Sequence, residues 1–317
     1  MYFYSYSTPE GERYLLSKEE IRKIKENVPN LSDGLKIKIS DKMLQIIKLS
    51  DDGRDLWVPA LSRAVYPDPI EHWVGSEIFE AINVLYIYGQ VALIGEKGTG
   101  KNYLCELISE IFGLDYFQIA GSEDVREASI MGSTEVRQGE TKFVEGILPQ
   151  WARKGGLLVI DESNMIEPAI LMRINEATDF RRQVTVSKNT VIKRHDDAYL
   201  ILTLNPTTKT YAGTHNLNLA FLDRFPVISF DLPTIEKEEE ILRRKSLTVP
   251  QKLHEAIGRV RELYREGKLS NTISTRQIEK FAALSEVVGY ERAVRILFIN
   301  QYMDREERKT VERLLLG

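Results

Sequence analysis

The sequence is short of cysteine and lacks long apolar runs. Its 317 residues include one cysteine, Cys105, which excludes an intramolecular disulfide and a cysteine-rich zinc module. Such low cysteine usage is typical of a reducing compartment. No apolar stretch approaches the roughly 20 residues of a membrane helix, and no basic-then-apolar leader opens the chain. We therefore expect a cytoplasmic protein without a membrane segment.

The composition also lacks a strong charge of either sign. The formal net charge is −4 and the isoelectric point is about 5.8, so no protein-wide positive field indicates nucleic-acid binding. Apolar residues make up 43% of the chain, which is enough for a folded core. At roughly 100–200 residues per domain, the length predicts two domains, or one large domain with an appendage.

The pattern along the chain divides it into three predicted parts. Residues 1–68 form an N-terminal appendage, in which the capping box Ser17-x-x-Glu20 predicts a helix through Val28. A second helical stretch is expected at 41–49. Residues 69–234 form an α/β domain, and residues 235–317, where strand signals disappear, form a small all-α domain.

Short apolar runs alternate with helical patterns in the middle part, which predicts an α/β fold with a mainly parallel sheet. Strands are expected at 91–94, 114–119, 157–160, 200–204 and 227–230. Helices are expected at 70–88, 102–111 and 166–177 there, and at 236–245, 251–266, 274–288 and 291–315 in the last part.

A glycine-rich loop follows the first of these strands directly and precedes a helix. It reads Gly95-Glu96-Lys97-Gly98-Thr99-Gly100-Lys101-Asn102. The glycines let successive backbone N–H groups converge on one anion, and the helix start adds its positive dipole end. Lys101 supplies a charge to the β- and γ-phosphates of a nucleotide. Asn102 replaces the usual Ser or Thr, and its amide oxygen is still able to meet Mg²⁺ directly or through water.

Polar side chains end two further predicted strands. Asp161 and Glu162 follow the apolar run at 157–160, where ligands bind in open α/β sheets. Asp161 is expected to hold Mg²⁺ through water, and Glu162 to orient and deprotonate the attacking water. Asn205 directly follows the strand expected at 200–204, where its side-chain amide is suited to hydrogen-bond the γ-phosphate or the attacking water. Asn-Pro pairs also begin turns.

Together these motifs resemble AAA+ ATPases, and most closely their MoxR and dynein/midasin-related branch. The segments that carry the resemblance are GEKGTGKN at 95–102, LLVIDESNMIEPAILMRINEATD at 157–179, LTLNPTTKTYAGTHNLNLAFLDRF at 202–225 and STRQIEKF at 274–281. The resemblance covers residues 69 to about 300. It implies a P-loop NTPase αβα core followed by a helical lid.

The resemblance also assigns roles to individual residues. Lys101 is the Walker A lysine, and Asp161 with Glu162 forms Walker B. Asn205 matches sensor 1, Arg224 matches an arginine finger that acts on the neighbouring subunit's nucleotide, and Arg276 matches sensor 2. The nucleotide-binding residues it implies are Gly95, Glu96, Lys97, Gly98, Thr99, Gly100, Lys101, Asn102, Tyr103 and Arg276. Residues 121–146, with a hairpin at 135–144, resemble the helix-2 insert, and residues 180–196 resemble the hairpin before sensor 1.

The function that this resemblance implies is ATP hydrolysis with Mg²⁺ in a ring, most often a hexamer, that remodels or activates a partner protein. A von Willebrand factor A domain protein is the first partner expected. Two alternatives stay open. Asn102 is compatible with a slowly hydrolysing, nucleotide-gated binding module. A DNA-associated motor of the same superfamily is disfavoured by the acidic isoelectric point.

Overall fold

The computed structural model describes five strands among residues 1–59, and residues 77–317 except 113, 138–139, 188–189 and 207–218. The chain forms two compact units. The first comprises Met1–Ile94, Lys101–Thr207 and Gly213–Ser229. The second comprises Gly95–Gly100, Thr208–Ala212 and Phe230–Gly317. The three-part division made from the sequence stays a prediction.

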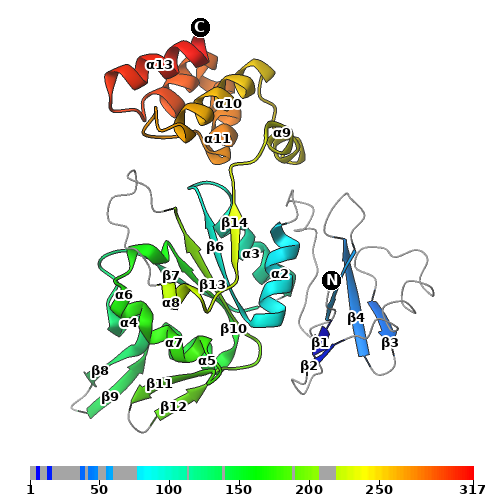
Figure 1. The fold of residues 1–317 in the computed structure, drawn as a ribbon, viewed down its shortest axis with the longest axis vertical. Coiled ribbons are helices and arrows are strands. Elements are labelled where there is room, and N and C mark those ends of the chain that lie inside the picture. The colour runs from blue at the N-terminus through cyan, green and yellow to red at the C-terminus, as the bar shows by residue number, and fades with distance from the viewer. Residues whose placement is uncertain are drawn as a thin grey trace. The chain divides into compact units, whose positions relative to one another are not determined.

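A five-stranded sheet organises the first unit (Figure 1). Its strands, in spatial order, are β14 (Val227–Phe230), β6 (Gln90–Gly95), β13 (Ala198–Leu204), β10 (Gly156–Asp161) and β7 (Tyr116–Ala120). The pairs β6–β13, β13–β10 and β10–β7 are parallel. The predicted α/β class is therefore confirmed, and the five expected strands lie within about two residues of their predicted bounds.

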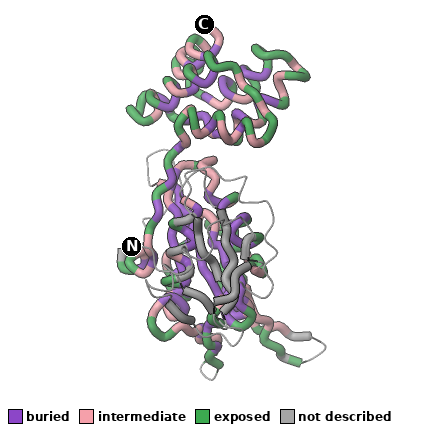
Figure 2. Tube along the Cα trace, turned by 90° about the vertical axis from the view of Figure 1, so that its right-hand side faces the viewer, coloured by how far each residue is buried: buried purple, intermediate pink, exposed green. Residues whose placement is uncertain are grey.

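The central strands are buried on both faces, as their uninterrupted apolar sequences predict. All seven residues of β13 are buried, and so are the first five of β10. In Figure 2 the buried segments of this unit lie mainly in its interior, and most exposed segments lie at its periphery. The helices of this unit are α2 (Glu77–Tyr88), α3 (Lys101–Phe112), α4 (Glu127–Met131), α5 (Ile147–Lys154), α6 (Pro168–Leu171), α7 (Asn175–Thr178) and α8 (Leu219–Leu222).

Two antiparallel hairpins interrupt the core and lie at the lower end of this unit in Figure 1. They pair β8 (Gly132–Arg137) with β9 (Glu140–Glu145), and β11 (Gln183–Ser187) with β12 (Thr190–Lys193). Both hairpins expected from the sequence are present. The continuous helix expected at 166–177 is wrong, because the 3₁₀ turn η3 (Met172–Ile174) separates α6 from α7. The 3₁₀ turn η2 (Ser163–Met165) precedes α6.

The second unit contains helices and no strand of its own among the residues described, apart from Gly95 and Phe230, the last residues of β6 and β14. Its helices are α9 (Ile235–Arg244), α10 (Gln251–Arg265), α11 (Thr275–Val288), α12 (Tyr290–Val294), the π-helical turn η4 (Arg295–Ile299) and α13 (Arg305–Leu316). A single helix at 291–315 was expected and is wrong. The helical segment ends at Ile299, and Asp304 begins a new helix, because its carboxylate accepts hydrogen bonds from the backbone N–H groups of Glu306 and Glu307.

The strands described before residue 60 form two small antiparallel sheets. They are β1 (Ser5–Ser7) with β2 (Arg13–Leu15), and β3 (Lys36–Ile39), β4 (Lys42–Lys48) and β5 (Asp55–Pro59) in that order. The helix expected at 41–49 is therefore wrong. The run Met43-Leu44-Gln45-Ile46-Ile47 fits either period, and pairing with strands on both sides decides for β. The helix expected through Val28 lies outside the described residues.

Within the described part of the chain, no helix is long and apolar enough to cross a membrane.

Candidate functional site

The glycine-rich loop connects the end of β6 at Gly95 to the start of α3 at Lys101. Gly98 has a φ of +84° and Gly100 a φ of +93°, a region that residues with a Cβ rarely adopt. The Thr99 hydroxyl donates to the Glu96 carbonyl at 2.9 Å. The loop therefore adopts the turn geometry that the glycines predicted, directly before a helix N-terminus.

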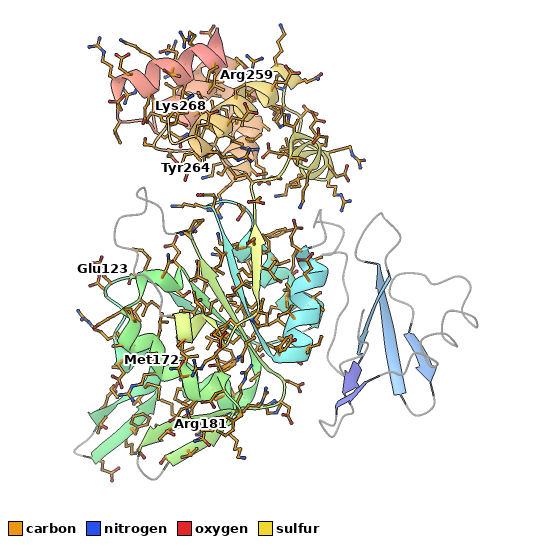
Figure 3. All side chains as sticks on the ribbon, in the orientation of Figure 1. Glu123, Met172, Arg181, Arg259, Tyr264 and Lys268 are labelled. Carbon is orange, nitrogen blue, oxygen red and sulfur yellow. The ribbon has the colours of Figure 1, made fainter. Side chains whose placement is uncertain are left out.

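Within the second unit, this loop lies against the helices. A Cβ on Gly98 would come within 2.5 Å of the Ser274 Cβ, so only glycine fits there. Ser274 is the N-cap of α11, where a capping box with Gln277 begins the helix. The Tyr264 hydroxyl on α10, labelled in Figure 3, donates to Glu96 Oε2 at 3.2 Å.

In the first unit, three polar side chains form a chain of hydrogen bonds across neighbouring strand ends. Lys101 Nζ donates to Asn205 Oδ1 at 3.3 Å, and Asn205 Nδ2 donates to Glu162 Oε1 at 3.4 Å. Lys101 and Asn205 are buried, with 7% and 8% of their surface exposed. The structure therefore brings together three residues that the sequence placed 43 and 104 positions apart.

The arrangement follows from the sheet order. Strand β13 lies between β6 and β10, and all three run parallel. Their carboxyl ends therefore meet at one edge of the sheet. Lys101 follows β6 by way of the loop, Glu162 follows β10 and Asn205 follows β13.

Asp161, the last residue of β10, is held by three hydrogen bonds. Its Oδ2 accepts from Asn102 Nδ2 at 2.6 Å. Its Oδ1 accepts from the Thr203 hydroxyl at 2.5 Å and from the Glu162 backbone N–H at 3.0 Å. The carboxylate is thereby fixed in orientation beside the start of α3, while remaining partly exposed.

Glu162 has a left-handed backbone, with φ 45° and ψ 43°. Non-glycine residues adopt this conformation at a cost of about 1–3 kcal/mol, and such residues gather at functional sites. Two contacts retain it here: the Glu162 N–H also donates to the Thr203 hydroxyl at 3.0 Å, and Gly121 packs so closely that a Cβ there would lie 2.2 Å from the Glu162 carbonyl oxygen.

These residues fit Mg²⁺ that arrives with a nucleotide. Mg²⁺ prefers oxygen ligands and in such sites takes one or two protein ligands together with phosphates and waters. Asp161 supplies a carboxylate, and Asn102, whose Nδ2 bonds that carboxylate, has its amide oxygen as the remaining ligand atom. Among the described residues, no cluster of three or more His, Cys, Asp or Glu side chains forms a metal cage.

Arg224 lies in the short turn between α8 and β14. Its guanidinium Nη1 donates to the Ala220 carbonyl, and its Nε is buried without a hydrogen-bond partner. Tyr103 lies exposed on the first turn of α3. Arg276 is exposed at the second residue of α11, in the second unit. The roles expected for these three side chains stay predictions.

The sequence analysis missed Thr203 and Asn164. Thr203 is 1% exposed and is the one residue with an aliphatic hydroxyl in the apolar strand β13. That polar interruption is the signal that could have identified it. Asn164 is 2% exposed and donates from Nδ2 to the Asn205 carbonyl at 3.1 Å. Asn164 contacts Asn205 only because the fold brings the two residues together, so no local sequence pattern pointed to it.

Residues 90–225 match the family model described as AAA domain (dynein-related subfamily). An uncharacterized protein of Staphylococcus aureus is 28% identical over 256 residues, covering 76% of this chain and 96% of that protein. An uncharacterized protein of Staphylococcus epidermidis is 29% identical over 248 residues, covering 74% and 92%. A solved structure from Cytophaga hutchinsonii, described as a candidate ATPase, has a TM-score of 0.44 and 19% identity over 78% of this chain and 84% of that one.

The region that matches this family model spans the glycine-rich loop, both strand ends and Arg224, and the match supports ATPase activity.

Proposed function

We propose that this chain is a MoxR-like AAA+ ATPase that hydrolyses ATP in a ring, and that the hydrolysis remodels or activates a partner protein. The observation that carries the proposal is the hydrogen-bonded chain from Lys101 through Asn205 to Glu162. It links the cation expected to bind phosphate to the carboxylate expected to activate water. A sheet edge with this set of groups suits phosphoanhydride hydrolysis.

Each residue of the site has a separate proposed role. The loop's N–H groups and Lys101 bind the β- and γ-phosphates. Glu162 accepts the proton of the attacking water, which Asn205 helps to orient through the amide that contacts both Lys101 and Glu162. Mg²⁺, held by Asp161 and Asn102, would neutralise charge that develops on the phosphate oxygens.

Arg224 is proposed to act on the nucleotide of the next subunit. A guanidinium supplied in trans stabilises the transition-state charge and is worth roughly 10³–10⁵ in rate in GTPase systems. A hexameric ring is the assembly we propose, since it places each Arg224 against a neighbouring site. Arg276 on α11 is proposed to contact the phosphates from the helical part, as sensor 2.

The two hairpins are the proposed partner-facing surface. Phe143 on β9 is 45% exposed and Val191 on β12 is 51% exposed, so each hairpin presents an apolar side chain to solvent. The partner we propose is a protein, with a von Willebrand factor A domain protein as the first candidate. Co-purification of such a protein with the ATP-bound Glu162→Gln variant tests this assignment.

The enzymatic proposal is tested by ATP turnover with Mg²⁺ and by nucleotide binding. Glu162→Gln should retain binding and lose turnover by about 10²–10⁴. Lys101→Ala should lose tight binding, whereas Lys154→Ala, at an exposed lysine on α5, should change neither. Retention of tight ATP binding by Lys101→Ala would refute the phosphate-binding role.

The assembly is tested by mixing variants. Arg224→Ala subunits keep the pocket and lack the arginine, and Lys101→Ala subunits have the reverse defect. In a randomly mixed ring with head-to-tail interfaces, about a quarter of the interfaces combine an intact pocket with an intact arginine. The mixture should therefore recover about a quarter of wild-type turnover, and the separate variants almost none. An inactive mixture would contradict the action in trans.

A second function is favoured by one contact, that of Asn102 with Asp161. An amide in place of a hydroxyl beside the metal ligand suits a module that binds nucleotide, hydrolyses it slowly and acts by assembly. Equal turnover of the wild-type chain and Glu162→Gln, with nucleotide-dependent assembly in both, would support this function over the first.

A further inference from the structure

A buried polar network lies at the end of the sheet opposite the nucleotide-binding edge, where β6 and β13 begin. Its centre is Gln90, the first residue of β6, of which 5% is exposed. The Gln90 Nε2 donates to the Thr178 carbonyl at 2.8 Å and to the Arg224 carbonyl at 2.8 Å. One side chain thus ties the end of α7 to the backbone of Arg224.

The oxygen of the same Gln90 amide is also hydrogen-bonded. Gln90 Oε1 accepts from Arg194 Nη1 at 2.9 Å. Arg194 is 4% exposed and follows the last residue of β12. Gln90 therefore makes three hydrogen bonds at once, and each leads to a different segment of the first unit.

Arg194 fixes the side of the network that belongs to the hairpin. Its guanidinium donates to the carbonyls of Gly89, Ala177 and Ala198, at 2.5, 2.8 and 2.7 Å. It also lies 4.9 Å from the centre of the Trp151 ring, within cation–π distance. Its backbone N–H donates to the Arg182 carbonyl at 2.7 Å, which closes the base of the β11–β12 hairpin.

The Arg224 side of the network is a short turn anchored on both sides. Phe221 and Phe225 are 2% and 3% exposed, with ring centres 5.3 Å apart. The next residue, Pro226, accepts a hydrogen bond at its carbonyl from the Ala92 N–H of β6, at 2.9 Å. Within this turn, the Arg224 N–H donates to the Phe221 carbonyl at 3.3 Å, and the Arg224 carbonyl accepts the bond from Gln90.

We infer that Gln90 is a positioning residue for Arg224, and that it makes the base of the β11–β12 hairpin and the Arg224 turn one hydrogen-bonded unit. This inference rests on the proposed action of Arg224 in trans. A displacement of about 1 Å can cost on the order of a hundredfold in rate when a group must meet a reacting centre. A backbone carbonyl bond that holds the Cα of Arg224 therefore bears on turnover and not on nucleotide binding.

The test uses Gln90→Glu in the full-length chain. The carboxylate still accepts from Arg194 but no longer donates to the carbonyls of Thr178 and Arg224. Turnover should fall by about 10- to 100-fold while the KM for ATP and nucleotide affinity stay unchanged. The matched control is Gln150→Glu, since the Gln150 amide also donates to a backbone carbonyl, that of Glu145, at 2.8 Å. The control should keep wild-type turnover.

Mixed rings decide which subunit carries the defect. Gln90→Glu subunits should be rescued by Lys101→Ala subunits, which supply a well-placed arginine, and should not be rescued by Arg224→Ala subunits. Rescue by Arg224→Ala would overturn the inference, because it would place the damage in the variant's own pocket. Turnover equal to that of Gln150→Glu would overturn it as well.

The mixing experiments distinguish a failure of this inference from a failure of the proposed action of Arg224 in trans. If Arg224→Ala mixed with Lys101→Ala stays inactive, the action in trans fails. The double variant then measures the energetic coupling between Gln90 and Arg224. Gln90→Glu should add no further loss of turnover to Arg224→Ala, and an additive loss would refute the positioning role.

Discussion

Asn102 Nδ2 donates a hydrogen bond of 2.6 Å to Asp161 Oδ2. The residue that departs from the usual phosphate-loop pattern is thus bonded directly to the carboxylate at the end of β10. An amide carries a donor and an acceptor on different atoms, so it can bond the carboxylate with one and face a cation with the other. Asn102 is therefore hydrogen-bonded to Asp161 and, in the proposed site, has an amide oxygen left for Mg²⁺.

Removal of this amide should weaken Mg²⁺ binding. In Asn102→Ala, Asp161 loses one of the bonds that orient it, and groups of this kind are worth about 10- to 100-fold in metal affinity. The Mg²⁺ concentration for half-maximal ATP turnover should rise by about tenfold or more. Asn102→Thr restores a hydroxyl donor and should stay within about threefold of wild type. An unchanged Mg²⁺ requirement in Asn102→Ala would remove this residue from the metal site.

Thr203 should matter through its hydroxyl alone. Thr203→Val keeps the shape of the side chain but removes the bond to Asp161 Oδ1 and the acceptor for the Glu162 N–H. Loss of one partner of a buried hydrogen bond costs about 1–3 kcal/mol. We expect lower turnover and a lower free energy of unfolding in urea, and Thr203→Ser should recover most of both. Equal losses in the valine and serine variants would assign the effect to packing.

The sequence alone predicted the parts of the site that have a local pattern. Lys101 lies in a glycine-rich loop, and Asp161 and Glu162 end an apolar run, so strand and loop chemistry point to them without a structure. Gln90 and Arg194 have no such pattern. Their bonds join residues 88, 104 and 134 positions apart, which depend on the packing of whole segments.

The wrong predictions have the same origin. The stretch 41–49 was expected to be helical, and antiparallel partners on both sides make it the strand β4. In the last part of the chain, the apolar period of 291–315 continues through Asp304, whose side chain nevertheless begins a new helix. Periodicity reports which face is apolar, whereas strand pairing and capping decide where an element begins and ends.

The second unit should be strongly destabilised when its buried ion pair loses one partner. Arg261 Nη2 lies 2.8 Å from Glu238 Oε1, and the side chains are 4% and 0% exposed. Removal of one partner of such a pair costs about 3–5 kcal/mol, because the other charge stays buried and uncompensated. Arg261→Met should therefore lower the stability of this unit strongly in urea unfolding followed by circular dichroism.

The control for this prediction is an exposed pair in the same unit, Lys309 with Glu306, at 2.9 Å and with side chains 58% and 79% exposed. Lys309→Met should cost about 1 kcal/mol or less, since water screens exposed pairs. Similar losses in the two variants would mean that burial does not govern the strength of the Arg261–Glu238 pair.

The thiol of Cys105 should make native stability fall at alkaline pH. Burial, and secondarily the charge of Asp161, raise the pKa of this thiol well above its ordinary value, and the side chain is fully buried. The unfolded chain's thiol ionises near pH 8.5, whereas the native thiol keeps its proton. Above that pH the native state binds more protons than the unfolded state, so this contribution to stability is lost as the pH rises.

The measurement is urea unfolding at pH 7.5 and pH 9.5 for the wild-type chain and Cys105→Ala. The wild-type free energy of unfolding should decrease by up to about 1.4 kcal/mol more than that of the variant over this interval. The same burial should slow labelling of the native thiol by a disulfide reagent by at least about 100-fold relative to the unfolded chain. Parallel pH dependences of the two proteins, together with rapid native labelling, would show that the thiol ionises in the folded state.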